Sequence, residues 1–233
     1  MKKLAITFLI AMMPMAVFAS GSKLELKPAN VDLGDLESMQ RGAGYFVNYC
    51  QGCHTLKFMR VNRLAKDLGI PEDIAKQELL IGTDKIGEPM LNNLPADSAK
   101  QWFGVVPPDL SLTSRLRGED WIYNYLISFY KDPSAPSGWN NTVFENAAMP
   151  HVLANLQGVQ VLDHETNALT LESRGSKTDV YDQIAHDITA FLTYVGEPIQ
   201  AKRQQYGIYV MIFLLLFFVL AYMLKKDYWR DVH

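Results

Sequence analysis

The chain has 233 residues, of which 48% are hydrophobic and 20% charged, and its formal net charge is −3. This length allows one domain of ordinary size or two small ones, and the hydrophobic content excludes a wholly disordered chain. The mildly acidic balance argues against nucleic acid as a partner, because phosphate binding requires a basic face. The sequence has two cysteines, Cys50 and Cys53, so it is not a scaffold held together by several disulfides.

The N-terminus predicts an export signal. A basic start is followed by an apolar run from Leu4 to Phe18, and Val17-Phe18-Ala19 places small residues where a signal peptidase cuts. The run is short for a membrane span, so an uncleaved anchor is the weaker interpretation. We expect residues 1–19 to be removed and the folded domain to begin at Ser20.

A helix is predicted after Asp35, which is a suitable N-cap. Its apolar stripe has helical spacing and consists of Leu36, Met39, Ala43, Phe46, Val47 and Cys50. Gly42 and Gly44 lower the helix propensity, but they would let another backbone approach closely. The pattern predicts a helix that is crossed by a second one.

This helix ends in Cys50-Gln51-Gly52-Cys53-His54. A zinc site would need further cysteine ligands, and a thioredoxin-like dithiol does not require the histidine. Covalent haem uses all three residues, because two thiols add to the two vinyl groups of the porphyrin and the adjacent imidazole reaches the iron. The motif therefore predicts one covalently bound haem c, with His54 as the proximal ligand.

The residues alone leave more than one candidate for the second axial ligand. Met39 belongs to the helix stripe, and Met59 is only five residues from His54. Met90 and Met149 both lie in predicted loops, and sequence chemistry does not separate them. His151 is a third and weaker candidate, since a lone histidine is usually a surface or a satisfied core residue.

The last third of the chain predicts a hairpin and a second helix. Residues 159–161 and 169–171 alternate in polarity as hairpin strands do. A helical stripe follows before Gly196 and Pro198 end it, and it consists of Val180, Ile184, Ile188, Phe191, Leu192 and Val195. We expect this last helix to cross the first one and a polar linker to follow it.

Residues 206–224 predict a transmembrane helix. They carry no charge, and 19 residues of helix cover about 28 Å, close to the hydrocarbon thickness of a bilayer. Aromatic residues flank the run, and Lys225, Lys226 and Arg230 follow it. The expected topology places residues 20–205 outside the cytoplasm, with 17 basic and 23 acidic residues, and the tail 225–233 inside.

Three blocks of the sequence resemble the cytochrome c1 family. The first runs from Arg41 through the haem motif to Leu64 and includes Thr55-Leu56-Lys57-Phe58-Met59-Arg60. The second is Pro107-Pro108-Asp109-Leu110-Ser111 followed by Gly118-Glu119-Asp120, and the third combines Phe191-Leu192, Glu197-Pro198, Arg203 and Gly207 with the single span. A Cys-x-x-Cys-His motif occurs in many cytochromes, whereas its combination with the second block is far more specific.

The resemblance implies a mainly α protein: a cytochrome c-like haem domain with long loop insertions and one C-terminal transmembrane helix. It implies that Met149 is the axial methionine, that Arg115 contacts a haem propionate, and that Pro107 and Pro108 pack against the haem. Some family members carry a disulfide in this domain, and this chain has no cysteine to spare for one.

The resemblance also implies a function. The chain would take one electron from a Rieske iron–sulfur protein and pass it to a cytochrome c. It would act beside cytochrome b, as the electron-transfer subunit of quinol:cytochrome c oxidoreductase, in a dimeric complex of the bacterial inner membrane with its haem domain on the periplasmic side. The alternatives are a free-standing membrane-anchored electron shuttle and a gas-binding haem protein.

Overall fold

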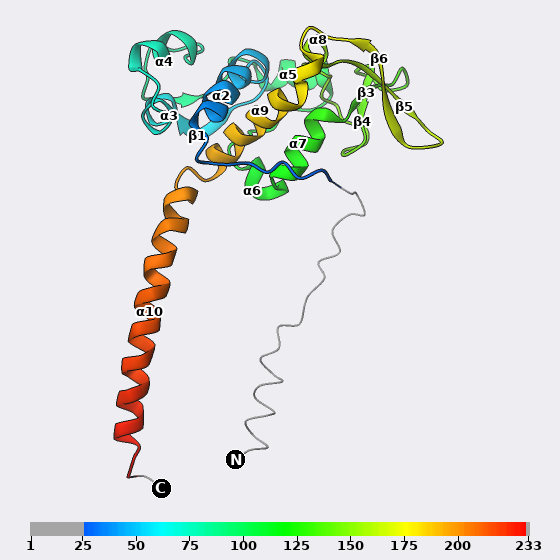
Figure 1. Cartoon of the computed structure of the whole chain (residues 1–233). Coiled ribbons are helices and arrows are strands. Elements are labelled where there is room, and N and C mark those ends of the chain that lie inside the picture. The colour runs from blue at the N-terminus through cyan, green and yellow to red at the C-terminus, as the bar shows by residue number, and fades with distance from the viewer. Residues whose placement is uncertain (1–25, 232–233) are drawn as a thin grey trace.

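The structure is a computed structural model that describes residues 26–231, so the predicted signal peptide lies outside the described residues. Helix α9 (Tyr181–Gly196) lies at the centre of the folded domain, with α2 (Leu36–Tyr49) and α7 (Glu119–Ile127) packed against it (Figure 1). The expectation of a mainly α domain is confirmed.

The crossing of α2 and α9 forms the middle of the core. Asp35 caps α2 by accepting a hydrogen bond from the Ser38 amide at 2.9 Å. The rings of Phe46 and Phe191 lie 5.5 Å apart between the helices, and both are fully buried. A Cβ added at Gly42 would lie 2.0 Å from the Asp187 carbonyl oxygen, so this glycine permits the close approach. Gly44 has no atom of another segment within 4 Å of such a Cβ, so the same expectation for Gly44 is wrong.

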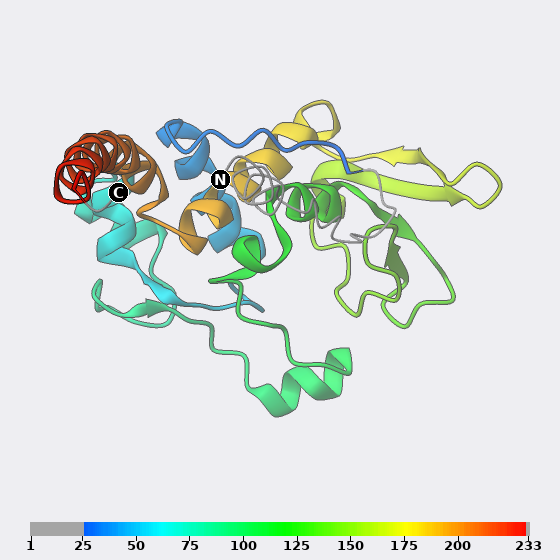
Figure 2. The same ribbon diagram turned by 90° about the horizontal axis from the view of Figure 1, so that it is seen from below.

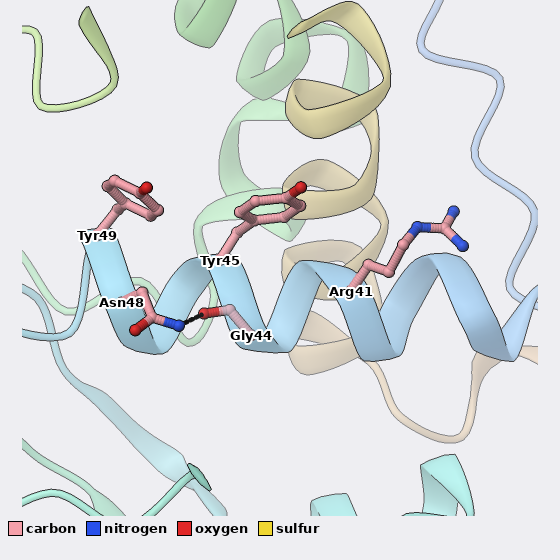
Figure 3. Close-up of a pocket in the computed structure, with 5 residues that line it drawn as sticks. All are labelled: Arg41, Gly44, Tyr45, Asn48 and Tyr49. Atoms are coloured by element: carbon pink, nitrogen blue, oxygen red, sulfur yellow. Dashed lines mark hydrogen bonds between the residues drawn. The ribbon is translucent and has the colours of Figure 1, made fainter. Parts of the chain in front are cut away.

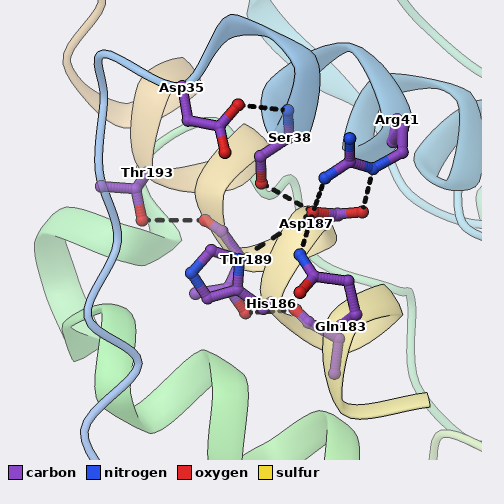
Figure 4. A network of polar contacts seen from close by, with 9 residues as sticks. Asp35, Ser38, Arg41, Gln183, His186, Asp187, Thr189 and Thr193 are labelled. Carbon is purple, nitrogen blue, oxygen red and sulfur yellow. Dashed lines mark hydrogen bonds and ion pairs between the residues drawn. The ribbon is translucent and has the colours of Figure 1, made fainter. Parts of the chain in front are cut away.

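A polar network joins the same two helices (Figure 4). The Asp187 carboxylate is almost completely buried, and it accepts hydrogen bonds from Arg41 at 2.7 and 3.0 Å and from Ser38 at 2.7 Å. Gln183 adds a further bond at 2.8 Å. Burial alone would raise the pKa of Asp187, but these donors outweigh it and the pKa is lowered. The buried carboxylate is therefore charged and fully paired at neutral pH.

Short elements surround this core. The remaining helices of the domain are α3 (Val61–Leu68), α4 (Glu72–Glu78), α5 (Ala96–Phe103), α6 (Thr113–Arg117), α8 (Ala154–Gln157) and the 3₁₀ turn η1 (Thr178–Val180). Residues 26–231 contain three antiparallel pairs of strands: β1 (Leu56–Arg60) with β2 (Pro89–Met90), β3 (Phe129–Lys131) with β4 (Trp139–Asn141), and β5 (Gly158–Asp163) with β6 (Ala168–Arg174). The predicted hairpin is confirmed as β5–β6, which projects from the end of the domain opposite α10 (Figure 2).

Helix α10 (Gln200–Tyr228) leaves the domain as one continuous helix of 29 residues. It is long and apolar enough to cross a membrane, with a mean hydropathy of 2.6 and no buried residue in its apolar window. It begins six residues before the predicted span, because Gln200–Gln205 are residues with good helix propensity, and the expected linker is reduced to a short turn. Glu197 in that turn accepts hydrogen bonds from Arg203 at 2.6 and 3.2 Å.

Candidate functional site

The two thiols and His54 lie in a turn that closes the C-terminal end of α2. The Phe46 carbonyl accepts hydrogen bonds from the amides of Cys50 and Gln51, and the Cys50 carbonyl accepts bonds from Cys53 at 3.0 Å and His54 at 2.8 Å. Both cysteines are free thiols, Cys50 buried and Cys53 half-buried. The side-chain Nε2 of Gln51 donates to the Leu91 carbonyl at 3.0 Å and anchors the turn to the chain after β2. The turn therefore holds the three residues of the motif together.

His54 is oriented by a single backbone contact. The ring is 9% exposed, and its Nδ1 lies 2.8 Å from the Pro108 carbonyl oxygen. A carbonyl can only accept, so Nδ1 carries the proton and Nε2 keeps its lone pair. Burial lowers the pKa of His54, although the Pro108 carbonyl and Asp109 oppose this effect. The imidazole is thus neutral, as metal coordination requires.

The loop that supplies the Pro108 carbonyl is tied to the chain just after His54. Asp109 accepts hydrogen bonds from the Thr55 hydroxyl at 2.6 Å, the Lys57 amide at 2.8 Å and the Ser111 amide at 3.0 Å. Burial would raise the pKa of Asp109, but these bonds outweigh it and the pKa is lowered. The Leu110 amide also donates to the Thr55 carbonyl at 2.9 Å. Asp109 therefore fixes the position of the carbonyl that orients His54, a role that the sequence patterns did not identify.

The candidate methionines have different surroundings. Met39, Met59 and Met90 are core residues with at most 2% exposure, and Met90 pairs with Leu56 across β1 and β2. Met149 instead lies half-buried in the loop between β4 and α8. Its sulfur accepts a hydrogen bond from the Tyr125 hydroxyl at 3.6 Å. Among these four methionines, Met149 alone has a thioether outside the tightly packed core.

His151 lies in an aromatic cluster. Its ring is 5% exposed, stacks on Phe129 with centroids 4.9 Å apart, and meets Trp139 and Tyr181 edge-on. Burial lowers the pKa of His151 to about 4. The ring is therefore a neutral part of the core, but its buried Nε2 has no hydrogen-bond partner among residues 26–231, so it is not the satisfied core histidine that was expected.

Two arginines after the Pro-Pro-Asp-Leu-Ser block have different partners. Arg115, predicted to contact a haem propionate, is exposed and lies 3.5 Å from a carboxylate oxygen of Glu197. Arg117 lies over the Trp121 ring at 5.1 Å, and Trp121 stacks on Tyr125, whose hydroxyl reaches Met149. The structure thus connects Arg117, rather than Arg115, to the surroundings of Met149. Arg117 ends α6 and Trp121 belongs to α7, with Gly118 between the two helices, so helical periodicity in the sequence does not predict this contact.

The outer face of α2 carries an open hollow of about 560 Å³ (Figure 3). It is lined by Arg41, Gly44, Tyr45, Asn48 and Tyr49, all from this one helix. Neither cysteine nor His54 lines it, and the Asn48 side chain is engaged with the Gly44 carbonyl at 2.8 Å. This hollow is distinct from the turn that carries the thiols.

The sequence was compared with protein-family models and with known proteins. The model of the cytochrome c1 family matches residues 77–232. The chain is 49% identical to the cytochrome c1 of Allochromatium vinosum over the whole length of both proteins. It is 45% identical to a Nitrosomonas europaea protein named ammonia monooxygenase gamma subunit, with 96% of each chain covered. A more distant relative, 26% identical over 85% of this chain and 73% of its own, is the mitochondrial cytochrome b-c1 complex catalytic subunit of Candida albicans.

Proposed function

Because the chain belongs to the cytochrome c1 family, we propose that it takes one electron from a Rieske iron–sulfur protein and passes it to a cytochrome c. Membership of the family makes it an electron-transfer cytochrome of the bc1 complex with a c-type haem. The names of its relatives associate it with cytochrome b. We further propose the electron donor, a Rieske protein, the electron acceptor, a cytochrome c, and the residues that hold the haem.

The observation that carries the proposal is the environment of His54. A buried neutral imidazole whose Nδ1 is held by the Pro108 carbonyl presents Nε2 as a ligand, and the two free thiols lie in the same turn. This donor set fits a haem c attached through Cys50 and Cys53. A bound haem c supplies a one-electron couple between ferric and ferrous iron.

Met149 is proposed as the second axial ligand. Its half-buried side chain and its loop position support this role, whereas Met90 is packed in the core beside Leu56. Sulfur ligation favours the ferrous state relative to two histidines, and two strong protein ligands keep the geometry similar in both oxidation states. With both axial positions filled by protein ligands, the iron would not bind gases, so the proposed electron-transfer role differs from that of a gas-binding sensor.

The proposed location is the bacterial inner membrane. Helix α10 anchors the chain, and the basic residues that follow its apolar part support a cytoplasmic tail and a periplasmic haem domain. In a bc1 complex this side faces the soluble or anchored cytochrome c. A signal peptide at residues 1–19 remains a prediction.

The Met149 assignment is tested by the Met149→Leu variant. We expect covalent haem to be retained, because the thiols and His54 are unchanged, and the midpoint potential to fall sharply because the sulfur ligand is lost. Redox titration of the purified protein measures this, and Met90→Leu is the matched control. An unchanged potential in Met149→Leu would overturn the ligand assignment.

The partners are tested by mild detergent extraction of the tagged full-length chain. We expect cytochrome b and a Rieske protein to co-purify with it in a dimeric complex. Isolation of the chain alone, with those two proteins assembled elsewhere, would favour the free-standing shuttle. Co-purification with a monooxygenase would favour the role that the name of the Nitrosomonas relative states.

A further inference from the structure

We propose that Tyr125 is a positioning residue for the Met149 sulfur and that its hydroxyl raises the midpoint potential of the bound haem. The hydroxyl oxygen lies 3.6 Å from the sulfur, with the O–H donating. The inference rests on the proposed function, because it concerns Met149 as an axial ligand. It goes further, because it assigns to Tyr125 of α7 the positioning of the Met149 sulfur.

The Tyr125 ring is held on several sides. It stacks on Trp121 with centroids 5.0 Å apart at 11°, and it meets Phe129 edge-on at 5.0 Å and 74°. The carbonyl of Tyr125 accepts a hydrogen bond from the Asn141 side chain at 2.8 Å. A ring fixed in this way has little freedom to move its hydroxyl away from the sulfur.

The loop that carries Met149 is fixed on both sides of the methionine. Before it, the Asn146 amide donates to the Asn140 side-chain oxygen at 2.8 Å. After it, His151 stacks on Phe129, the same ring that contacts Tyr125. The sulfur and the hydroxyl are therefore positioned by one connected cluster. This cluster provides, without a disulfide, the rigidity that a ligand loop requires.

The chemistry of a thioether explains the effect on the potential. Its sulfur has two lone pairs, so it can accept the Tyr125 proton and still bind a metal. A donor on one lone pair withdraws electron density from the sulfur and weakens its donation to ferric iron more than to ferrous iron. Hydrogen bonding around a ligand is one of the means by which a protein adjusts a haem potential. The Tyr125 hydroxyl should therefore favour the ferrous state.

The test compares Tyr125→Phe with Tyr123→Phe in the haem-loaded full-length protein. The first change removes only the hydroxyl and keeps the ring that packs on Trp121 and Phe129. The second removes a hydroxyl from the same helix, and within residues 26–231 the structure gives that hydroxyl no hydrogen bond. Two quantities are measured: the midpoint potential, and the charge-transfer absorption band of sulfur-ligated ferric haem.

We expect Tyr125→Phe to lower the midpoint potential and to shift the sulfur band without abolishing it, while Tyr123→Phe changes neither. If Tyr125→Phe leaves both unchanged, or if Tyr123→Phe shifts them equally, the inference is overturned. Met149→Leu separates the two levels of the argument, because it must abolish the sulfur band. Persistence of the band in that variant contradicts the ligand assignment itself, whereas its loss together with an inert Tyr125→Phe contradicts only the role of Tyr125.

Discussion

At His54 one hydrogen bond determines which ring nitrogen can act as a ligand. The partner is the backbone carbonyl of Pro108, 54 residues further along the chain, and its position depends on the side chain of Asp109. The family signature Pro-Pro-Asp-Leu-Ser thereby has a physical explanation in this chain. Its prolines restrict the loop backbone, and its aspartate ties that loop to Thr55 and Lys57.

Replacing Asp109 tests this explanation. Asp109→Asn puts an NH₂ group where a carboxylate oxygen accepts two donors, so we expect the free energy of unfolding to fall by about 1–2 kcal/mol. We also expect the midpoint potential to change, because the orientation of His54 loosens. Asp163→Asn is the matched control, since Asp163 accepts similar bonds in the hairpin loop far from His54. Equal effects of both variants on the potential would contradict the role of Asp109. Urea unfolding and redox titration supply the two measurements.

At the scale of elements, the crossing of α2 and α9 combines a close backbone contact with a buried charge. Gly42 allows the contact, and Asp187 receives four hydrogen bonds from three side chains of the two helices. Because α2 ends in the thiol turn, the position of the turn in the domain is set by this crossing.

The two glycines of α2 give a paired prediction. Gly42→Ala adds a Cβ 2.0 Å from the Asp187 carbonyl oxygen, so the helices must separate, and we expect a loss of stability of about 3 kcal/mol with reduced haem incorporation. Gly44→Ala meets no atom of another segment, so the gain in helix propensity should stabilise the protein by about 0.5–1 kcal/mol. Thermal unfolding distinguishes them, and similar effects of both would contradict the observed crossing.

Asp187 predicts a specific dependence of stability on pH. Its pKa is lowered in the fold, so its contribution is complete above the unfolded value of about 3.9 and is lost as the pH falls through the lower folded pKa. We expect Asp187→Asn to cost about 2 kcal/mol at pH 7, and the difference from the natural protein to shrink below pH 4. The exposed Asp182 on the same helix gives the control variant Asp182→Asn. A difference that stays constant down to pH 2 would count against the charged network.

At the scale of the whole molecule, two ion pairs that share Glu197 join α10 to the haem domain. Glu197 contacts Arg203 at the start of α10 and Arg115 on α6. The 29 residues of α10 extend over about 43 Å, more than the hydrocarbon core of a bilayer, so both helix ends reach the interfacial regions. If α10 spans the bilayer as proposed, these ion pairs would lie near the membrane surface, between the domain and its anchor.

The charge of the expected exported region leads to a prediction about encounter rates. Residues 20–205 carry a net charge of −6, which should steer a basic cytochrome c toward the domain. We expect the second-order rate of electron transfer to a basic cytochrome c to fall about tenfold between low and high salt, because the Debye length shortens from about 30 Å at 0.01 M to about 3 Å at 1 M. Stopped-flow mixing measures the rate, with an acidic acceptor as control. A rate independent of salt would falsify the steering.

Local sequence patterns predicted several of the helices and the hairpin of this protein. Helical spacing after Asp35, the alternation at 159–171 and the uncharged run at 206–224 each correspond to an element of the structure, because neighbouring residues determine such elements. The Cys-x-x-Cys-His motif predicts covalent haem for the same reason, since its three reactive residues lie within five positions, and this attachment remains a proposal. Local patterns did not predict three other features, because these depend on which residues lie opposite in space. They are the open surroundings of Gly44, the first residue of α10 and the ion pair of Arg115 with Glu197.

The sequence by itself determined the main elements, the Cys-x-x-Cys-His motif and the apolar C-terminal helix of this cytochrome. Only the tertiary structure decided which long-range partners surround the candidate site residues: the Pro108 carbonyl on His54, the Asp109 side chain on the Lys57 amide, and the Tyr125 hydroxyl on the Met149 sulfur. The physical reason is that hydrogen bonds between residues 24 to 54 positions apart have no periodic signature in the sequence. They arise when packing of α2 and α7 on α9 brings the loops together.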